Sequence, residues 1–79
     1  MSLYSVTAGT QGTVLSIGVS LGAQVKVAEV VIQIEIMKME IPVEVPVAGR
    51  VASIHVSPGE FVAQGQLLLM IDTDSGRAL

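Results

Sequence analysis

The feature that most constrains the fold of this chain is an internal repeat. When the sequence is shifted so that Gly12 falls on Gly49, a displacement of 37 residues, residues 12–22 align with residues 49–59. Most aligned pairs are identical or equally apolar, and the alignment continues as far as Glu35 and Asp72. Because self-similarity at a fixed period marks repeated structural units, the sequence predicts two similar halves that pack against each other.

Each half is rich in residues that favour β-strands. The chain contains 13 Val, 7 Ile and 4 Thr, whose branched side chains suit pleated strands better than helices. Gly and Pro separate the apolar runs, so each half is predicted to contain a short strand, a longer strand, a glycine turn and a final apolar strand. In the two halves these elements are expected at residues 5–8, 13–20, 21–22 and 30–36, and at residues 42–45, 50–57, 58–59 and 66–72.

The longer strand does not keep a strict alternation of apolar and polar residues. Its apolar spacing changes along Val14, Ile17 and Val19, and a break of this kind indicates a bulge or bend. After the following turn, Val25 in the first half and residues 61–62 (Phe and Val) in the second half are expected to pack inward.

Two such halves predict an all-β fold. We expect a flattened β-barrel, in effect a sandwich of two small antiparallel sheets with pseudo-twofold symmetry, the architecture called a barrel-sandwich hybrid. A single domain over residues 1–79 would contain a first half at about residues 5–37 and a second half at about residues 38–73. Pairing the halves buries their apolar faces and leaves fewer strand edges exposed.

Composition excludes several functions. The absence of cysteine removes disulfides, thiolate metal sites and cysteine catalysis. The net charge of −3 and the presence of only two aromatic residues, Tyr4 and Phe61, argue against nucleic-acid binding. The longest apolar run has five residues, at positions 67–71, far fewer than the roughly 18 of a membrane-spanning helix. Without a visible signal peptide, the expected location is the cytoplasm.

The sequence also shows no arrangement of catalytic or metal-binding groups. No cluster of residues has the spacing of metal ligands, and no nucleophile has a neighbouring base, so we expect no metal site and no independent enzyme. His55 lies between Ile54 and Val56, which places it on the opposite, solvent-exposed face of the strand with no partner for its ring.

The junction between the halves contains unusual turn residues. Residues 30–45 form one stretch in which apolar residues predominate. It is too long for a typical strand, and the repeat boundary places its reversal near residues 36–40. A tight hairpin favours Asn-Gly or Asp-Gly because its central residues need positive φ, whereas this chain offers Met37 and Lys38. Broken local rules are typical of functional sites, although a longer loop that tolerates any residue is an equal alternative.

Lys38 is the candidate functional residue of this turn. The chain has only one other lysine, Lys26, and the twofold relation between the halves predicts that Lys38 points toward a partner from the end opposite both termini. An amine can be acylated, and the flexible side chains of Met37 and Met39 suit adaptable contacts. The alternatives are that both methionines pack into the end of the barrel and that the nearby acidic residues are ordinary surface charges.

Residues 35–40 (Glu-Ile-Met-Lys-Met-Glu) resemble the biotin-attachment motif, whose core is Met-Lys-Met on an exposed β-turn. The surrounding sequence is similar to the biotinyl/lipoyl attachment domain family, of the biotinyl type found in biotin carboxyl carrier proteins. The resemblance covers about residues 5–73, and the matching segments in the two halves include residues 12–14, 17–19, 41–42, 48–51 and 54–56.

The resemblance implies a specific function. Lys38 would accept biotin through an amide bond made by a biotin protein ligase, with Met37 and Met39 as the flanking recognition motif and Glu35 helping the ligase to discriminate. The biotin would carry a carboxyl group between a biotin carboxylase and a carboxyltransferase. The chain would then be a monomeric carrier domain of a biotin-dependent carboxylase system, with the chemistry supplied by cofactor and partner enzymes.

Two alternatives to a biotin carrier follow from the same resemblance. Lipoyl domains, such as those of oxo-acid dehydrogenase complexes, share the fold but typically carry Asp-Lys-Ala at the tip, so Met37 and Met39 favour biotin. An unmodified interaction barrel is the other alternative.

The chain also departs from the biotinyl pattern. Ile36 stands in place of Ala, which is expected to affect turn geometry or ligase recognition, and Ala28 replaces a glycine, which is expected to change the backbone there.

Overall fold

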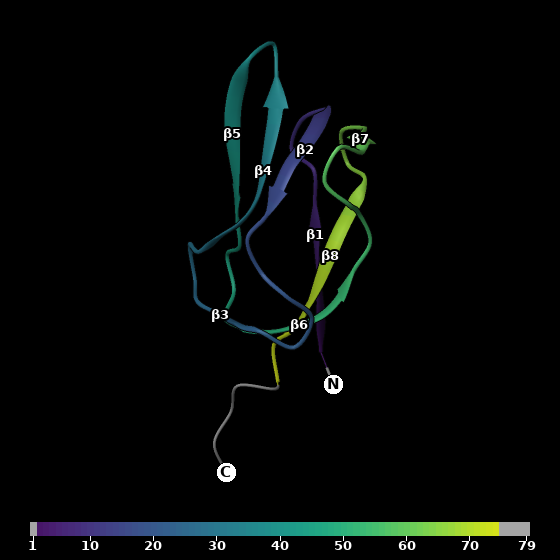
Figure 1. Ribbon diagram of the computed structural model, residues 1–79. Coiled ribbons are helices and arrows are strands. Elements are labelled where there is room, and N and C mark those ends of the chain that lie inside the picture. Colours follow the sequence, from purple (N-terminus) through teal and green to yellow (C-terminus); the bar gives the residue numbers. More distant parts are fainter. Residues whose placement is uncertain (1, 75–79) are drawn as a thin grey trace.

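The computed structural model describes residues 2–74 of the chain, which form eight β-strands (Figure 1). The strands are β1 (Leu3–Thr7), β2 (Gly12–Ile17), β3 (Gln24–Val25), β4 (Val30–Ile36), β5 (Met39–Glu44), β6 (Gly49–Ile54), β7 (Phe61–Val62) and β8 (Leu67–Asp72). The expected all-β class is therefore confirmed. The described residues include no helix with the length and apolarity needed to span a membrane.

The eight strands form two four-stranded antiparallel sheets. Sheet A has the strand order β1-β8-β6-β3, and sheet B has the order β5-β4-β2-β7. The 37-residue shift of the sequence repeat converts each strand of sheet A into the strand at the same place in sheet B. Each sheet therefore mixes strands of both halves, and the expected pseudo-twofold symmetry is confirmed.

The irregularities of the two sheets obey the same symmetry. The pairing of β2 with β4 shifts register between Val14 and Ser16, and the pairing of β6 with β8 shifts between Val51 and Ser53, the equivalent place. The bulge predicted from the apolar spacing is therefore present. The expected long strands 13–20 and 50–57 end earlier than predicted, because after the bulge the chain leaves the sheet toward the glycine turns.

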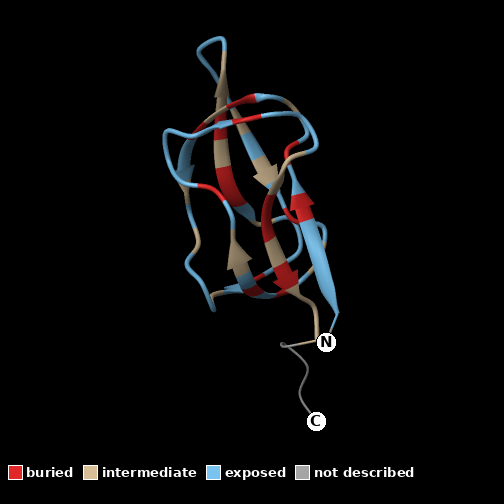
Figure 2. Ribbon diagram, turned by 90° about the vertical axis from the view of Figure 1, so that its right-hand side faces the viewer, coloured by how far each residue is buried: buried red, intermediate tan, exposed pale blue. Residues whose placement is uncertain are grey.

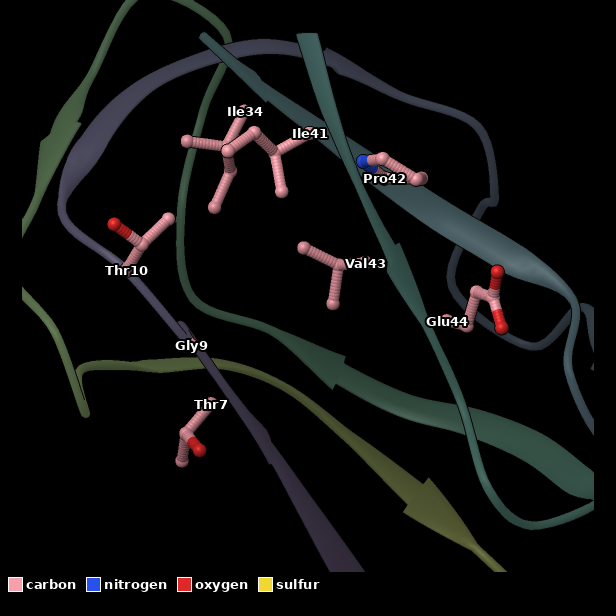
Figure 3. Close-up of a pocket in the computed structure, with 8 residues that line it drawn as sticks. All are labelled: Thr7, Gly9, Thr10, Ile34, Ile41, Pro42, Val43 and Glu44. Atoms are coloured by element: carbon pink, nitrogen blue, oxygen red, sulfur yellow. The ribbon is translucent and has the colours of Figure 1, made fainter. Parts of the chain in front are cut away.

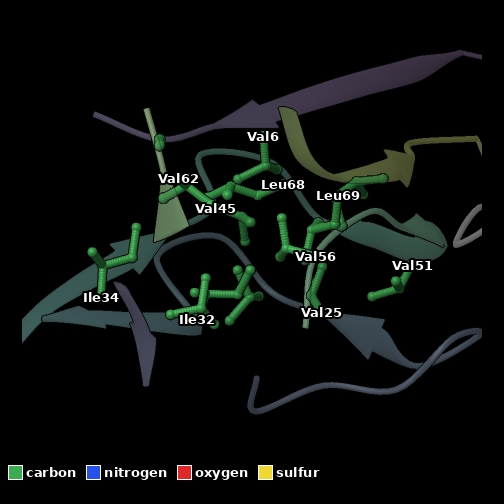
Figure 4. Packing of buried hydrophobic residues seen from close by; sticks show 14 residues of the cluster. Val6, Val25, Ile32, Ile34, Val45, Val51, Val56, Val62, Leu68 and Leu69 are labelled. Atoms are coloured by element: carbon green, nitrogen blue, oxygen red, sulfur yellow. The ribbon is translucent and has the colours of Figure 1, made fainter. Parts of the chain in front are cut away.

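The core lies between the two sheets and consists of aliphatic side chains (Figure 4). None of the described polar or charged residues is buried, and buried positions occur along strands of both sheets (Figure 2). Val25 and Val62 pack inward as predicted, but Phe61 does not, because it is 62% exposed. Successive strand residues point to opposite faces, so burial of Val62 forces Phe61 outward.

A glycine opens β2 and another opens β6, and both are required by close packing. A Cβ atom built on Gly12 would lie 2.6 Å from the carbonyl oxygen of Glu35, and one on Gly49 would overlap the carbonyl oxygen of Asp72. Any side chain at either place would push the neighbouring strand away. The repeated glycine at the start of each longer strand thus has a steric cause.

The departure at Ala28 does not change the backbone as expected. Ala28 has a φ of 71°, close to the 84° of Gly65, the glycine at the equivalent place of the second half. The surrounding hydrogen bonds impose this left-handed conformation, so the first-half loop keeps the same shape with a less suitable residue.

The two ends of the described chain lie together at the end opposite the β4–β5 turn (Figure 1). The backbone N–H of Thr73 donates to the carbonyl oxygen of Ser2 at 2.9 Å. In the repeat, this pair occupies the place of Ile36 and Met39, which flank the β4–β5 turn. The connected end and the open end of the barrel are therefore symmetry equivalents, as predicted.

Candidate functional site

The β4–β5 hairpin closes with a two-residue turn made of Met37 and Lys38. Ile36 pairs with Met39, and the two central residues have φ values of 51° and 65°. Positive φ at both central positions defines a type I′ turn, the connection that matches the twist of two antiparallel strands. The predicted reversal is confirmed, and it is a tight turn rather than the longer loop that was the alternative. Strand β5 therefore begins at Met39, earlier than predicted.

The turn residues are poorly suited to their conformation. A left-handed backbone costs a residue other than glycine roughly 1–2 kcal/mol, and Met37 and Lys38 both adopt it. The flanking strands impose the turn, because β4 and β5 pair along their whole length from Val30↔Glu44 to Ile36↔Met39. Ile36 fits this arrangement as the last strand residue, where a β-branched side chain is favourable, so it does not disturb the turn geometry.

The side chains at the turn face solvent. Met37 is 88% exposed and Met39 is 64% exposed, so neither packs into the end of the barrel. Lys38 is exposed as well, and no residue in the described range 2–74 forms an ion pair with it. Lys38 is thus open to solvent on the β4–β5 turn, which extends beyond the other strands (Figure 1).

Two carboxylates lie immediately below the turn. Glu35 of β4 and Glu40 of β5 are directly opposite each other in the strand register, on the outward face of the hairpin. Glu40 is exposed and Glu35 is half-buried. Like charges at directly opposed positions destabilise a sheet, so this arrangement is not explained by stability. Both residues were expected near Lys38, but their pairing was not predicted; a two-residue loop between residues 36 and 39 would have implied it.

The inward face of the hairpin borders an open groove of about 420 Å³ (Figure 3). Ile34 and Ile41, which pair across the hairpin, contribute to its apolar wall. The groove is lined by Thr7, Gly9, Thr10, Ile34, Ile41, Pro42, Val43 and Glu44. Among the described residues that line it, Glu44 is the only ionisable one.

The remaining candidate residues do not assemble into a site. Lys26 is exposed in the β3–β4 loop, where its backbone N–H donates to the Glu29 carboxylate at 2.9 Å. His55 is exposed as expected, but the expectation that its ring has no partner is wrong, because Nε2 lies 2.8 Å from the Ser53 hydroxyl. Within residues 2–74, no three potential metal-ligating side chains come together.

A flattened barrel with an exposed lysine on its hairpin turn matches a known family. Residues 4–71 match the family described as "Biotin-requiring enzyme". The match covers most of the chain, and the chain belongs to this family.

Relatives of known name support the biotinyl type. The chain is 41% identical over 66 residues to the biotinylated protein TB7.3 homolog of Mycobacterium leprae (strain TN), covering 84% of this chain and 93% of that protein. It is 37% identical over 67 residues to the biotin-dependent acyl-coenzyme A carboxylase alpha3 subunit of the same organism, and 34% identical over 67 residues to pyruvate carboxylase of Bacillus subtilis (strain 168). In these larger proteins the aligned part covers 85% of this chain but only 11% and 6% of theirs.

Solved structures of large carboxylases contain the same fold. The urea carboxylase of Kluyveromyces lactis matches with a TM-score of 0.85 at 26% identity, over 91% of this chain and 6% of that one. A single-chain, multi-domain long-chain acyl-CoA carboxylase matches with a TM-score of 0.84 at 30% identity, over 96% of this chain and 7% of that one. The chain therefore resembles both a small biotinylated protein and a small segment of much longer carboxylases.

Proposed function

We propose that this chain is a biotin carboxyl carrier and that Lys38 is its attachment residue. The observation that carries the proposal is the position of Lys38 in an exposed two-residue turn, beyond the other strands (Figure 1) and free of ion pairs within the described residues. Membership of a biotin-requiring family and the similarity to a biotinylated protein support biotin as the cofactor.

The geometry of the turn suits amide formation on the lysine. Acylation acts on the unprotonated amine, which the enzyme must be able to surround. The amide product no longer carries the positive charge of the lysine ammonium group. No buried or paired group has to be released when Lys38 reacts, because its side chain already projects into solvent. The flanking Met37 and Met39 are both exposed and offer soft apolar contacts to the acylating enzyme, a biotin protein ligase.

Lys26 does not share these properties. Its loop folds back onto the barrel, where the backbone N–H of Ala28 donates to the carbonyl oxygen of Val45 at 2.7 Å. An enzyme that engaged Lys26 would meet the side of the barrel rather than a projecting tip. Lys26 is therefore the natural internal control for Lys38.

The carrier role follows from a division of labour. When attached, biotin supplies the group that holds the transferred carboxyl, while this chain supplies a rigid hairpin that presents it. We assign a biotin carboxylase and a carboxyltransferase as the enzymes that the loaded carrier visits. The support is that this chain matches a segment of several carboxylases, one of which is named as biotin-dependent. In this proposal the chain acts as one monomeric carrier domain in the cytoplasm.

Intact mass measurement tests the attachment. The protein is produced with an active biotin protein ligase and biotin, and the expected product carries one biotin. Lys38→Arg should abolish the modification, whereas Lys26→Arg should leave it complete. Lipoate in place of biotin would move the assignment to a lipoyl carrier, and an unmodified product in the presence of active ligase would favour an interaction barrel.

A further inference from the structure

Strand β1 forms one edge of sheet A, because it is the first strand in the order β1-β8-β6-β3. The bond from the Thr73 N–H to the Ser2 carbonyl oxygen makes these two residues a hydrogen-bonded pair. Bonded and non-bonded pairs alternate along an antiparallel ladder, so Leu3 and then Ser5 occupy non-bonded positions opposite β8. Their backbone N–H and C=O groups therefore point outward, and no described residue supplies a backbone partner on that side.

Strand β5 is the symmetry equivalent of β1 and forms one edge of sheet B. The 37-residue shift places Glu40, Pro42 and Glu44 of β5 where β1 has Leu3, Ser5 and Thr7. Proline has no N–H to offer to an added strand, and charged side chains on an edge discourage pairing with another chain. The edge of β5 thus carries two kinds of protection that the edge of β1 lacks.

The side chains of β1 also suit contact with another chain. Its five residues include no charged residue and no proline, and Leu3 is 47% exposed and Tyr4 38% exposed. An uncharged edge with exposed apolar side chains is a ready template for one more strand. Because β1 and β5 hold equivalent places in the same fold, the barrel itself does not require β1 to be unprotected.

A hollow of about 320 Å³ lies beside this edge. It is lined by Tyr4, Val27, Ala28, Glu44, Val45 and Pro46. Glu44 is the only one of these residues that carries a charge at neutral pH, and no residue in the described part of the chain forms an ion pair with it. Charge complementarity therefore calls for an occupant with a basic side chain for Glu44 and an apolar side chain for the hollow.

We propose that the free edge of β1 binds an extended segment of another polypeptide, which adds a fifth strand to sheet A and pairs a Lys or Arg with Glu44. Main-chain hydrogen bonds to Leu3 and Ser5 would supply affinity, and the hollow would supply specificity. A second copy of β1 does not match this chemistry, because the strand has no basic residue. Leu3 lies at the end of the barrel opposite Lys38 (Figure 1), so the inference does not depend on the proposed attachment.

Hydrogen exchange of the full chain, followed by NMR, tests the edge with a defined probe. The probe is a short blocked peptide of alternating Val and Thr with one central Arg. Saturating peptide should slow exchange of the Leu3 and Ser5 amides roughly tenfold or more, since these N–H groups gain a partner. The amide of Tyr4 already faces β8 and should change little. A peptide with Glu in place of Arg should bind roughly tenfold more weakly.

Three variants locate the binding site. Ser5→Pro copies the residue that β5 has at the equivalent place and should abolish the protection of the Leu3 amide. Leu3→Glu copies the neighbouring position and should raise the Kd of the peptide roughly tenfold without altering the backbone. Glu44→Gln should raise that Kd to a similar extent, whereas the matched control Glu40→Gln, on the same strand but outside the hollow, should leave it unchanged. Thermal unfolding verifies that each variant is folded.

Each contrary result has a definite meaning. Unchanged exchange of Leu3 and Ser5 with peptide present, or slowing that persists in folded Leu3→Glu, would overturn binding at this edge. Equal affinity for the Arg and Glu peptides would overturn the assignment of a basic segment. Sedimentation of the wild-type protein as a dimer that Leu3→Glu converts to a monomer would assign the edge to a second copy and overturn the proposal. Biotinylation of Lys38, measured by intact mass, should be the same in all these variants.

Discussion

Ala28 and Gly65 make the same backbone hydrogen bond in the two halves of the barrel. The N–H of Ala28 donates to the carbonyl oxygen of Val45, and the N–H of Gly65 donates to that of Ala8, in both cases at 2.7 Å. The acceptors are themselves equivalent under the 37-residue shift. The tertiary contact with the residue that directly follows β5 or β1 therefore holds the loop in a left-handed conformation whether or not the residue is glycine.

Replacement of Ala28 by glycine should stabilise the protein. Removal of the Cβ atom relieves the energetic cost of the left-handed backbone. This gain is larger than the loss that comes from the greater conformational entropy of glycine in the unfolded chain. Ala28→Gly should therefore raise the free energy of unfolding by about 0.5–1 kcal/mol. Urea-induced unfolding measures the change. The reverse substitution Gly65→Ala is the matched control and should destabilise by a similar amount; a loss of stability in Ala28→Gly would contradict the interpretation.

The turn sequence should be replaceable by a more stable one at the expense of function. A double variant with Met37→Asn and Lys38→Gly installs the preferred type I′ pair and should stabilise the hairpin by about 1–2 kcal/mol. The same variant should not accept biotin, since it has no lysine at the turn. Thermal unfolding and intact mass provide the two measurements, and a less stable variant would show that the turn is not strained.

The glycines that open the longer strands should tolerate no side chain. Gly12→Ala and Gly49→Ala would press a methyl group against a backbone carbonyl of the neighbouring strand, and each should destabilise by about 1–3 kcal/mol or more. Chemical denaturation gives the values. Gly9→Ala is the control, because a Cβ atom there would meet nothing within 4 Å, and equal losses at all three positions would argue against the steric cause.

The two residues of β7 should contribute very differently to stability. Val62 is fully buried and Phe61 is 62% exposed. Val62→Ala should therefore cost about 2 kcal/mol through lost packing, whereas Phe61→Ala should change the free energy of unfolding by less than about 0.5 kcal/mol. Equilibrium unfolding of both variants checks the contrast. A large loss in Phe61→Ala would mean that the ring packs on the barrel and is not available to a partner.

Much of the architecture could be predicted from the chain because the responsible forces are local or periodic. β-Branched residues indicated strands, the repeat indicated two equivalent halves, and the irregular spacing of Val14 and Ile17 located the bulge. The strand ends were less accurate, since the residues after the bulge remain apolar although the chain has left the sheet. Phe61 was misplaced for the same reason: apolar character alone does not reveal which of two adjacent strand residues faces inward.

The sequence by itself determined the candidate residue, because Lys38 lies at the boundary of the repeat within a Met-Lys-Met segment whose resemblance identified the biotinyl type. Only the tertiary structure decided how that residue is presented. The pairing of β4 with β5 forces Met37 and Lys38 into a left-handed turn that neither prefers. It also brings Glu35 and Glu40 face to face and aligns them with Phe61 of a distant strand. Pairings of this kind depend on strand register, which arises from the whole sheet rather than from any local segment.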